Sequence, residues 1–172
     1  MMLTTHALMG TAAASLFPEQ PIVAFVAGFA SHFVLDAIHH WDYDEYLSSI
    51  QKNPTNPLET DMRVGSRVFL RDLMLIAGDA VLGLTLSILL FHFLLFQVPL
   101  RIVVIGVCAG IVPDALQFVY WKTRAKTRVL EPLQRFHIWI QEGKKLHVKP
   151  WVGIGLQCAL VAVVIIALKL IA

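Results

Sequence analysis

Long apolar stretches constrain this 172-residue chain more than any other feature of its sequence. A membrane-crossing helix needs about 20 predominantly apolar residues. The candidate stretches are residues 4–17, 21–40, 69–96, 100–121 and 151–171. The first is short for a full crossing, which fits a tilted, thin or re-entrant helix. With 57% hydrophobic and 15% charged residues, the composition is not that of a soluble domain. We therefore expect one all-α integral membrane domain over residues 1–172, a polytopic membrane helical bundle of about five membrane helices.

Two polar segments interrupt these stretches. Residues 41–67 mix Asp, Glu, Lys, Pro and Asn without sustained apolar periodicity, which predicts a loop in water or among headgroups. Residues 122–149 interleave apolar side chains with eight lysines or arginines, as in an interfacial amphipathic helix. The positive-inside rule places this basic segment in the cytoplasm. Five crossings then put residues 41–67 on the same side, in a multi-pass protein of the inner (cytoplasmic) membrane.

The fourth apolar stretch contains Gly106 and Gly110, four residues apart. This spacing lets membrane helices approach closely, although it also arises by chance. It predicts a close helix contact at these glycines.

Most ionisable side chains within the apolar stretches fall toward one side of the membrane in this topology. They are His6, His32, Asp36, His39, His40, Asp72, Asp79 and Asp114. His92, near the far end of the third stretch, is the exception and fits an interfacial or packing role. An ionisable side chain within a bilayer is costly unless it pairs, lines a wet cavity or binds a metal. Convergence from four helices therefore predicts a shared site near the cytoplasmic face.

The end of the second stretch has the pattern of a metal site. His32, Asp36 and His39 are spaced i, i+4 and i+7, on one stripe of an α-helix. Imidazole with carboxylate suits Zn²⁺, Mn²⁺ or Fe²⁺. The competing interpretation is a helix end that is polar because it meets headgroups. We expect a divalent metal ion, zinc first and manganese or iron as alternatives. Its expected ligands are His6, His32, Asp36, Asp79 and Asp114.

The remaining candidates concern catalysis and substrate. His39 or His40 could serve as a further ligand or general acid. Lys122 and Arg124 of the basic segment can attract phosphate headgroups. His137 could be a metal ligand or a third substrate-binding residue, and a solvated amphipathic face explains it as well as these two together. The sequence has no Gly-rich phosphate loop and no serine-nucleophile elbow, so metal-assisted hydrolysis is the simplest enzymatic interpretation.

Short motifs also resemble known hydrolases. The segment HFVLDAIHHWD at residues 32–42 resembles the H-x-x-x-D motif, followed by another His, of zinc-dependent phospholipase C and related nucleases. Thr5-His6, SHFVLD at 31–36 and GIVPD at 110–114 together resemble the bacterial membrane-bound, metal-dependent hydrolase family. The His-Arg segment and second Thr-His pair of that family have no counterpart here. The resemblance implies a helical bundle that hydrolyses a phosphoester and holds metal among His6, His32, Asp36 and Asp114.

The sequence thus predicts a membrane-embedded, divalent-metal-dependent hydrolase of a phosphoester such as a phospholipid or lipid-linked phosphate. The alternative is a non-catalytic membrane protein that binds or transports metal ions or protons. A structural bundle whose polar residues only pair with one another is a third reading. The expected partners are the lipid bilayer and the lipid substrate, and a homo-oligomer is left open. A net charge of +2 gives no indication of nucleic-acid binding.

Overall fold

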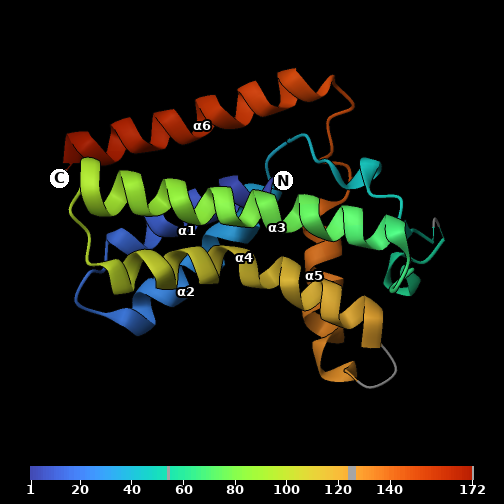
Figure 1. The fold of residues 1–172 in the computed structure, drawn as a ribbon. Helices are drawn as coiled ribbons and strands as arrows, with labels where there is room; N and C mark the ends of the chain where they lie inside the picture. The colour runs from blue at the N-terminus through green and yellow to red at the C-terminus, as the bar shows by residue number, and fades with distance from the viewer. Residues whose placement is uncertain (54, 124–126, 172) are drawn as a thin grey trace.

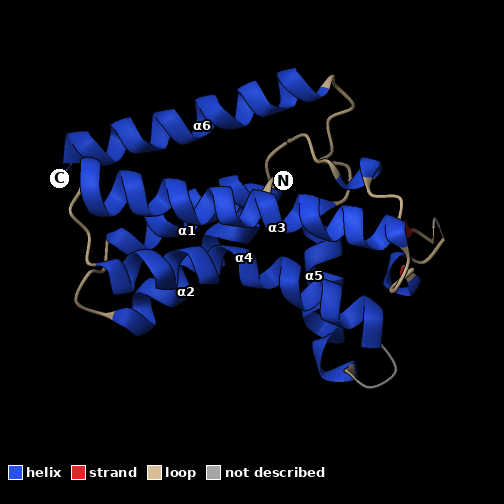
Figure 2. Cartoon of the chain, viewed as in Figure 1, coloured by secondary structure: helices blue, strands red, loops and turns tan. Residues whose placement is uncertain are grey.

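The described chain is predominantly helical. The computed structural model describes residues 1–53, 55–123 and 127–171. The helices within them are α1 (Leu3–Ser15), α2 (Pro21–Asp36), α3 (Arg67–Ser87), α4 (Leu100–Thr123), α5 (Glu131–Gln141) and α6 (Pro150–Ile171) (Figure 1). Strands β1 (Ile50–Gln51) and β2 (Asp61–Met62) form a short antiparallel hairpin before α3 (Figure 2). The all-α prediction is therefore confirmed.

Among the described residues, three helices are long and apolar enough to cross a membrane. They are α3 with its π-helical continuation η3 (Ile88–Leu94), α4 and α6. Helix α2 is apolar but has 16 residues, and α1 has 13. At about 1.5 Å per residue, α1 is about 20 Å long, shorter than a hydrocarbon core of roughly 30 Å. The structure thus supports membrane association through three helices, and five crossings stay a prediction.

Helix α1 lies inside the bundle and packs against α2, α3 and α4. Glycines make this possible. A Cβ atom on Gly10 would lie 2.4 Å from the Gly106 carbonyl oxygen, and one on Gly110 would lie 2.3 Å from the His6 carbonyl oxygen. The close contact predicted at Gly106 and Gly110 is confirmed, and it brings His6 against α4.

The N-terminus of α1 is held by an acid on α3. Asp79 accepts hydrogen bonds from the backbone N–H groups of Leu3 at 2.7 Å and Thr4 at 3.2 Å, and from the Thr4 hydroxyl at 2.5 Å. Backbone N–H groups in the first turn of a helix have no partner within the helix, and an acid there also complements the helix dipole. Asp79 therefore fixes α1 relative to α3.

Helix α6 runs along one edge of the bundle and is anchored by one glutamine (Figure 1). Gln157 accepts hydrogen bonds from the Met2 N–H at 3.1 Å and the Thr5 hydroxyl at 2.8 Å, and donates to the Trp41 carbonyl at 2.9 Å. Its amide satisfies groups from α1 and from the loop after α2. The contact joins α6 to the end of the bundle at which α1 begins.

Two loop contacts position α5 beside the end of α2. The His40 N–H donates to the Lys144 carbonyl at 3.0 Å, and the Leu146 N–H donates to the His40 carbonyl at 2.7 Å. Helix α5 itself packs against α2 and α4. The basic segment therefore folds back onto the bundle, and one face of α5 is directed inward.

The opposite end of the bundle is apolar. Its core includes Phe91, Ile102 and Val103, all fully buried. His92 bonds through Nδ1 to the Val98 carbonyl at 2.8 Å, across the turn between η3 and α4. This contact matches the packing role expected of His92.

Candidate metal centre

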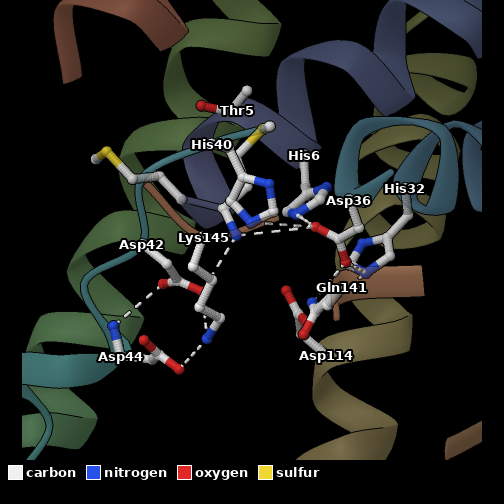
Figure 3. Close-up of polar contacts among 12 residues, drawn as sticks. Thr5, His6, His32, Asp36, His40, Asp42, Asp44, Asp114, Gln141 and Lys145 are labelled. Carbon is white, nitrogen blue, oxygen red and sulfur yellow. Dashed lines mark hydrogen bonds and ion pairs between the residues drawn. The ribbon is translucent and has the colours of Figure 1, made fainter. Parts of the chain in front are cut away.

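Four helices direct ionisable side chains to one buried point. His6 comes from α1, His32 and Asp36 from α2, Asp114 from α4 and His137 from α5. Figure 3 shows His6 and His32 beside the Asp36 carboxylate, with Asp114 facing the same space. The side chains are fully buried except that of Asp114, which is 26% exposed. Asp114 is therefore the exposed edge of this cluster.

The Asp36 carboxylate is the centre of the cluster. Its Oδ2 lies 2.9 Å from His137 Nε2 and 3.2 Å from His32 Nε2. Its Oδ1 lies 3.4 Å from His6 Nε2 and 3.9 Å from His40 Nε2. One acid thus faces two groups of imidazoles, one through each oxygen.

The separations on the Oδ2 side fit the shell of a small divalent ion. His32 Nε2 lies 3.0 Å from His137 Nε2, and Asp114 Oδ1 lies 3.7 Å and 3.6 Å from the same two atoms. In a tetrahedral site with bonds of about 2.0–2.1 Å, donor atoms are about 3.3–3.4 Å apart. The ligand atoms of His32, Asp36 and His137 lie within 4.8 Å of one another, as do those of His6, His32 and Asp114. Both groups combine imidazole with carboxylate, which suits zinc, manganese or iron.

Several buried atoms of the cluster have no hydrogen-bond partner among the described residues. They are both ring nitrogens of His6, Asp36 Oδ1, His40 Nε2 and His137 Nδ1. Leaving a buried polar group unsatisfied costs about 1–3 kcal/mol. Three of these atoms, on His6, Asp36 and His40, face one another on the Oδ1 side. The Met1 ammonium already lies 3.8 Å from Asp36 Oδ1. A metal ion on this side would therefore replace that ammonium.

The His32 ring is held in the tautomer that a metal ligand needs. Its Nδ1 lies 2.8 Å from the Gly110 carbonyl, which can only accept a hydrogen bond. Nδ1 therefore carries a proton, and Nε2 is the ring nitrogen that faces Asp36 and His137. A backbone carbonyl behind the ring is a common way to orient a metal-binding histidine.

The other predicted residues fall outside this cluster or at its edge. Asp79 uses its carboxylate to cap α1, so the structure does not bring it to the other predicted ligands. His39 is exposed, whereas His40 is buried beside Asp36. Lys122 is exposed near the end of α4, and Arg124 lies outside the described residues.

The sequence left one residue of the cluster open and missed another. His137, considered as a ligand, a substrate contact or a surface residue, lies among the candidate ligands. Gln141 was not singled out, yet its Nε2 donates to Asp36 Oδ2 at 2.7 Å. Gln141 follows His137 by four residues on an amphipathic helix, so the sequence places both side chains on the same helix face. This spacing could have identified Gln141.

The cluster opens onto a large cavity. The cavity has a volume of about 1340 Å³, and both Asp114 and Gln141 line it. One part of its wall is apolar and comes from α3 and α4, and another is polar and includes Asp42, Asp44 and Lys145. The cluster is thus accessible to a molecule of substantial size at Asp114, whereas the other candidate ligands lie behind it and are buried.

The polar wall is a network of opposite charges. Lys145 forms ion pairs with Asp44 and, at 3.7 Å, with Asp42 (Figure 3). Lys52 lies 2.8 Å from Asp44. Burial disfavours the Lys145 ammonium, but the two carboxylates outweigh burial and raise the pKa of Lys145 above its usual value. Lys145 therefore stays charged at the cavity wall.

Comparison with protein-family models, curated proteins and solved structures finds no match for this chain. The function of this chain is therefore inferred from the geometry of the site.

Proposed function

We propose that this protein is a membrane-embedded hydrolase that uses divalent metal to cleave a phosphoester. The observation that carries the proposal is the buried Asp36 carboxylate between histidines of three helices, with unsatisfied donor atoms around it. A cluster that only paired its own charges would leave fewer buried nitrogens without partners. Its opening onto a cavity at Asp114 supplies the access that a substrate needs.

The ligand roles follow from the donor atoms. His32, His137, Asp36 and Asp114 would hold one ion, and His6 with the second oxygen of Asp36 could hold another. A divalent ion in such a site polarises a phosphoryl oxygen and lowers the pKa of a bound water to about 7. Zinc is the first expectation, with manganese or iron as alternatives.

The other groups would orient rather than bind metal. Gln141 donates to Asp36 Oδ2 and restrains the carboxylate. His40, with Nε2 3.9 Å from Asp36 Oδ1, is the better placed of the two candidate general acids because His39 is exposed. The exposed Lys122 would attract anionic headgroups toward the same end of the bundle.

The substrate we propose is a phospholipid or lipid-linked phosphate that approaches from the cytoplasmic leaflet. The mixed polar and apolar cavity wall supports an amphiphile over a small polar phosphate. Transport of ions or protons is less well supported, because a path needs polar groups throughout its depth. The opposite end of the bundle has a core of Phe91, Ile102 and Val103 instead.

Elemental analysis of the purified protein in mild detergent tests the metal, and hydrolysis of a panel of phosphomonoesters and phosphodiesters, followed by detection of the alcohol product, tests catalysis. We expect stoichiometric metal and turnover in the wild type, and loss of both in His32→Ala and Asp36→Ala. His92→Gln is the matched control, because it replaces a histidine at the opposite end of the bundle. Absence of metal, with no His32-dependent binding of added Zn²⁺ or Mn²⁺, would overturn the proposal. Metal binding without turnover would replace it by the non-catalytic alternative.

A further inference from the structure

The facing sides of α3 and α4 diverge along part of their length. Cavity-lining residues on α3 follow the i, i+3, i+4, i+7 pattern of one helix face: Leu73, Ile76, Ala77 and Ala80. Those on α4 follow the same pattern: Ile111, Asp114, Ala115 and Phe118. Helices in direct contact bury such facing stripes, yet all eight residues are half-buried or exposed. The two stripes, here called the α3–α4 slot, therefore enclose an apolar space instead of packing together.

One end of the α3–α4 slot meets the candidate metal centre. Asp114 belongs to the α4 stripe, and its Oδ1 lies 3.7 Å from His32 Nε2 and 3.6 Å from His137 Nε2. Its neighbours on the stripe, Ile111, Ala115 and Phe118, are apolar. A molecule with a polar group at Asp114 would thus place its next atoms against hydrocarbon.

The surroundings of the slot indicate where such a molecule comes from. Both helices are among the three that could cross a membrane. The α3 face beside the slot is strongly exposed and apolar, with Leu70 at 57%, Met74 at 67% and Leu75 at 54%. In a bilayer this face meets lipid chains. Hydrocarbon chains are therefore the apolar material next to the slot.

We propose that the α3–α4 slot binds the acyl chain of a membrane phospholipid, which enters laterally between the two helices. The phosphoester would then lie at Asp114 and Gln141, beside the candidate ligands. The volume of about 1340 Å³ exceeds the roughly 300–1,000 Å³ of pockets for small ligands. The proposal rests on the proposed function for the reaction, but binding of the chain does not require turnover.

Substitution of the small residues of the α3 stripe by larger ones tests this binding. Ala77→Trp and Ala80→Leu fill the α3–α4 slot from one side, whereas Met74→Trp places a tryptophan on the exposed face of α3. The probe is a phospholipid with a diazirine near the end of its acyl chain, in vesicles of phosphatidylethanolamine and phosphatidylglycerol. The purified full chain is reconstituted, irradiated and mapped by mass spectrometry.

We expect crosslinks on the two stripes in the wild type and equally in Asp36→Asn, because the chain site does not need metal. Ala77→Trp should lower crosslinking to the α4 stripe at least about tenfold, a change of about 1.4 kcal/mol in binding, and Met74→Trp should leave it unchanged. Size-exclusion profiles and metal content identify a variant that fails to fold, in which case Ala80→Leu gives the comparison. Wild-type crosslinks spread over the outer faces of α3, or crosslinks unaffected in both slot variants, would overturn the inference.

Measurements of hydrolysis with two substrates distinguish binding of an acyl chain in the slot from the proposed hydrolase activity. We expect Ala77→Trp to lose hydrolysis of the long-chain phosphoester and to keep hydrolysis of a water-soluble phosphoester. Equal loss of both in a folded, metal-loaded variant would contradict a chain-binding slot. Slot crosslinks in a protein that binds no metal and cleaves neither substrate would instead remove the proposed function and leave the slot.

Discussion

At the residue scale, the Asp36 carboxylate determines what the candidate centre can bind. Oδ2 faces His32 and His137, and Oδ1 faces His6. A carboxylate placed in this way can bridge two ions, as in two-metal hydrolytic sites. Removal of this acid should therefore affect every ion, whereas removal of one outer histidine should affect one.

Asp36→Asn should abolish metal binding, and His6→Ala should lower the stoichiometry by no more than one ion. The amide keeps the shape of the side chain but loses the charge that neutralises the ion. Elemental analysis after dialysis against Zn²⁺ measures both, with His92→Gln as the control. Full metal content in Asp36→Asn would show that the carboxylate is not a ligand.

Gln141→Leu should weaken Zn²⁺ affinity about 10- to 100-fold, the usual effect of losing a group that orients a ligand. Its amide donates to Asp36 Oδ2 at 2.7 Å, so its loss frees the carboxylate. Calorimetric titration of the metal-free protein gives the Kd. Gln20→Leu, an exposed glutamine before α2, should have no effect. Unchanged affinity in both variants would mean that Gln141 does not position Asp36.

At the element scale, the crossing of α1 and α4 brings the ligands together. Gly110 is within contact of the His6 backbone, and its carbonyl accepts from the His32 ring. One residue therefore sets the separation of two helices and the orientation of a third helix's histidine.

Gly110→Ala should destabilise the bundle by about 1–3 kcal/mol, the usual cost of overpacking, and lower metal affinity. The new methyl would lie 2.3 Å from the His6 carbonyl oxygen, so the backbones must separate. Gly78→Ala on α3 is the matched control, because a Cβ there meets nothing within 4 Å. Thermal unfolding in detergent, with metal content, checks both. Equal midpoints for the two variants would contradict this account of the crossing.

Asp79→Ala should cost about 0.5–2 kcal/mol of stability, as loss of a helix cap does, and leave the metal content unchanged. The reason is that its carboxylate bonds to Leu3 and Thr4 at the start of α1. Thermal unfolding in detergent and metal content check this prediction, and Asp61→Ala, at an exposed position, is the control. Loss of metal at unchanged stability would restore Asp79 as a ligand.

At the scale of the whole molecule, polar and apolar chemistry separate along the bundle axis. The candidate centre and charged network occupy one end, and the apolar core lies at the other. The turn between α1 and α2 reaches this other end, where Glu19 lies 3.7 Å from Arg101. The α1–α2 hairpin thus extends as far as the turn before α4, although its helices are short.

This arrangement predicts that the C-terminus and the loop of residues 41–67 lie on opposite sides of the membrane. Gly153, in the first turn of helix α6, packs against Trp41, and near the other end of α6 the Lys169 ammonium lies 4.8 Å from the centroid of the Phe96 ring. Reporter fusions after residue 172 and within the loop measure sidedness in cells. We expect a cytoplasmic loop and a non-cytoplasmic C-terminus, and two cytoplasmic reporters would exclude the crossing by α6.

Part of the ligand set could be predicted from the sequence, because the spacing of residues within one helix fixes which of them share a face. The i, i+4 spacing of His32 and Asp36 places both on one face whatever the helix packs against. The positions of His6 and Asp114 within their apolar stretches likewise placed them at the same end of the bundle as His32 and Asp36. Asp79 has a similar depth, yet its carboxylate reaches the start of α1, because the rotation of α3 in the bundle decides its direction.

The sequence by itself determined the helical class, the apolar stretches and the end of the bundle at which ionisable side chains gather. These follow from the cost of transferring polar groups into hydrocarbon and from the helical repeat, which act within each segment. Only the tertiary structure decided that His137 and Gln141 join Asp36, and that α3 and α4 leave a slot beside Asp114. Those contacts join residues about 100 positions apart, and the rotation of one helix against another depends on all of its neighbours at once.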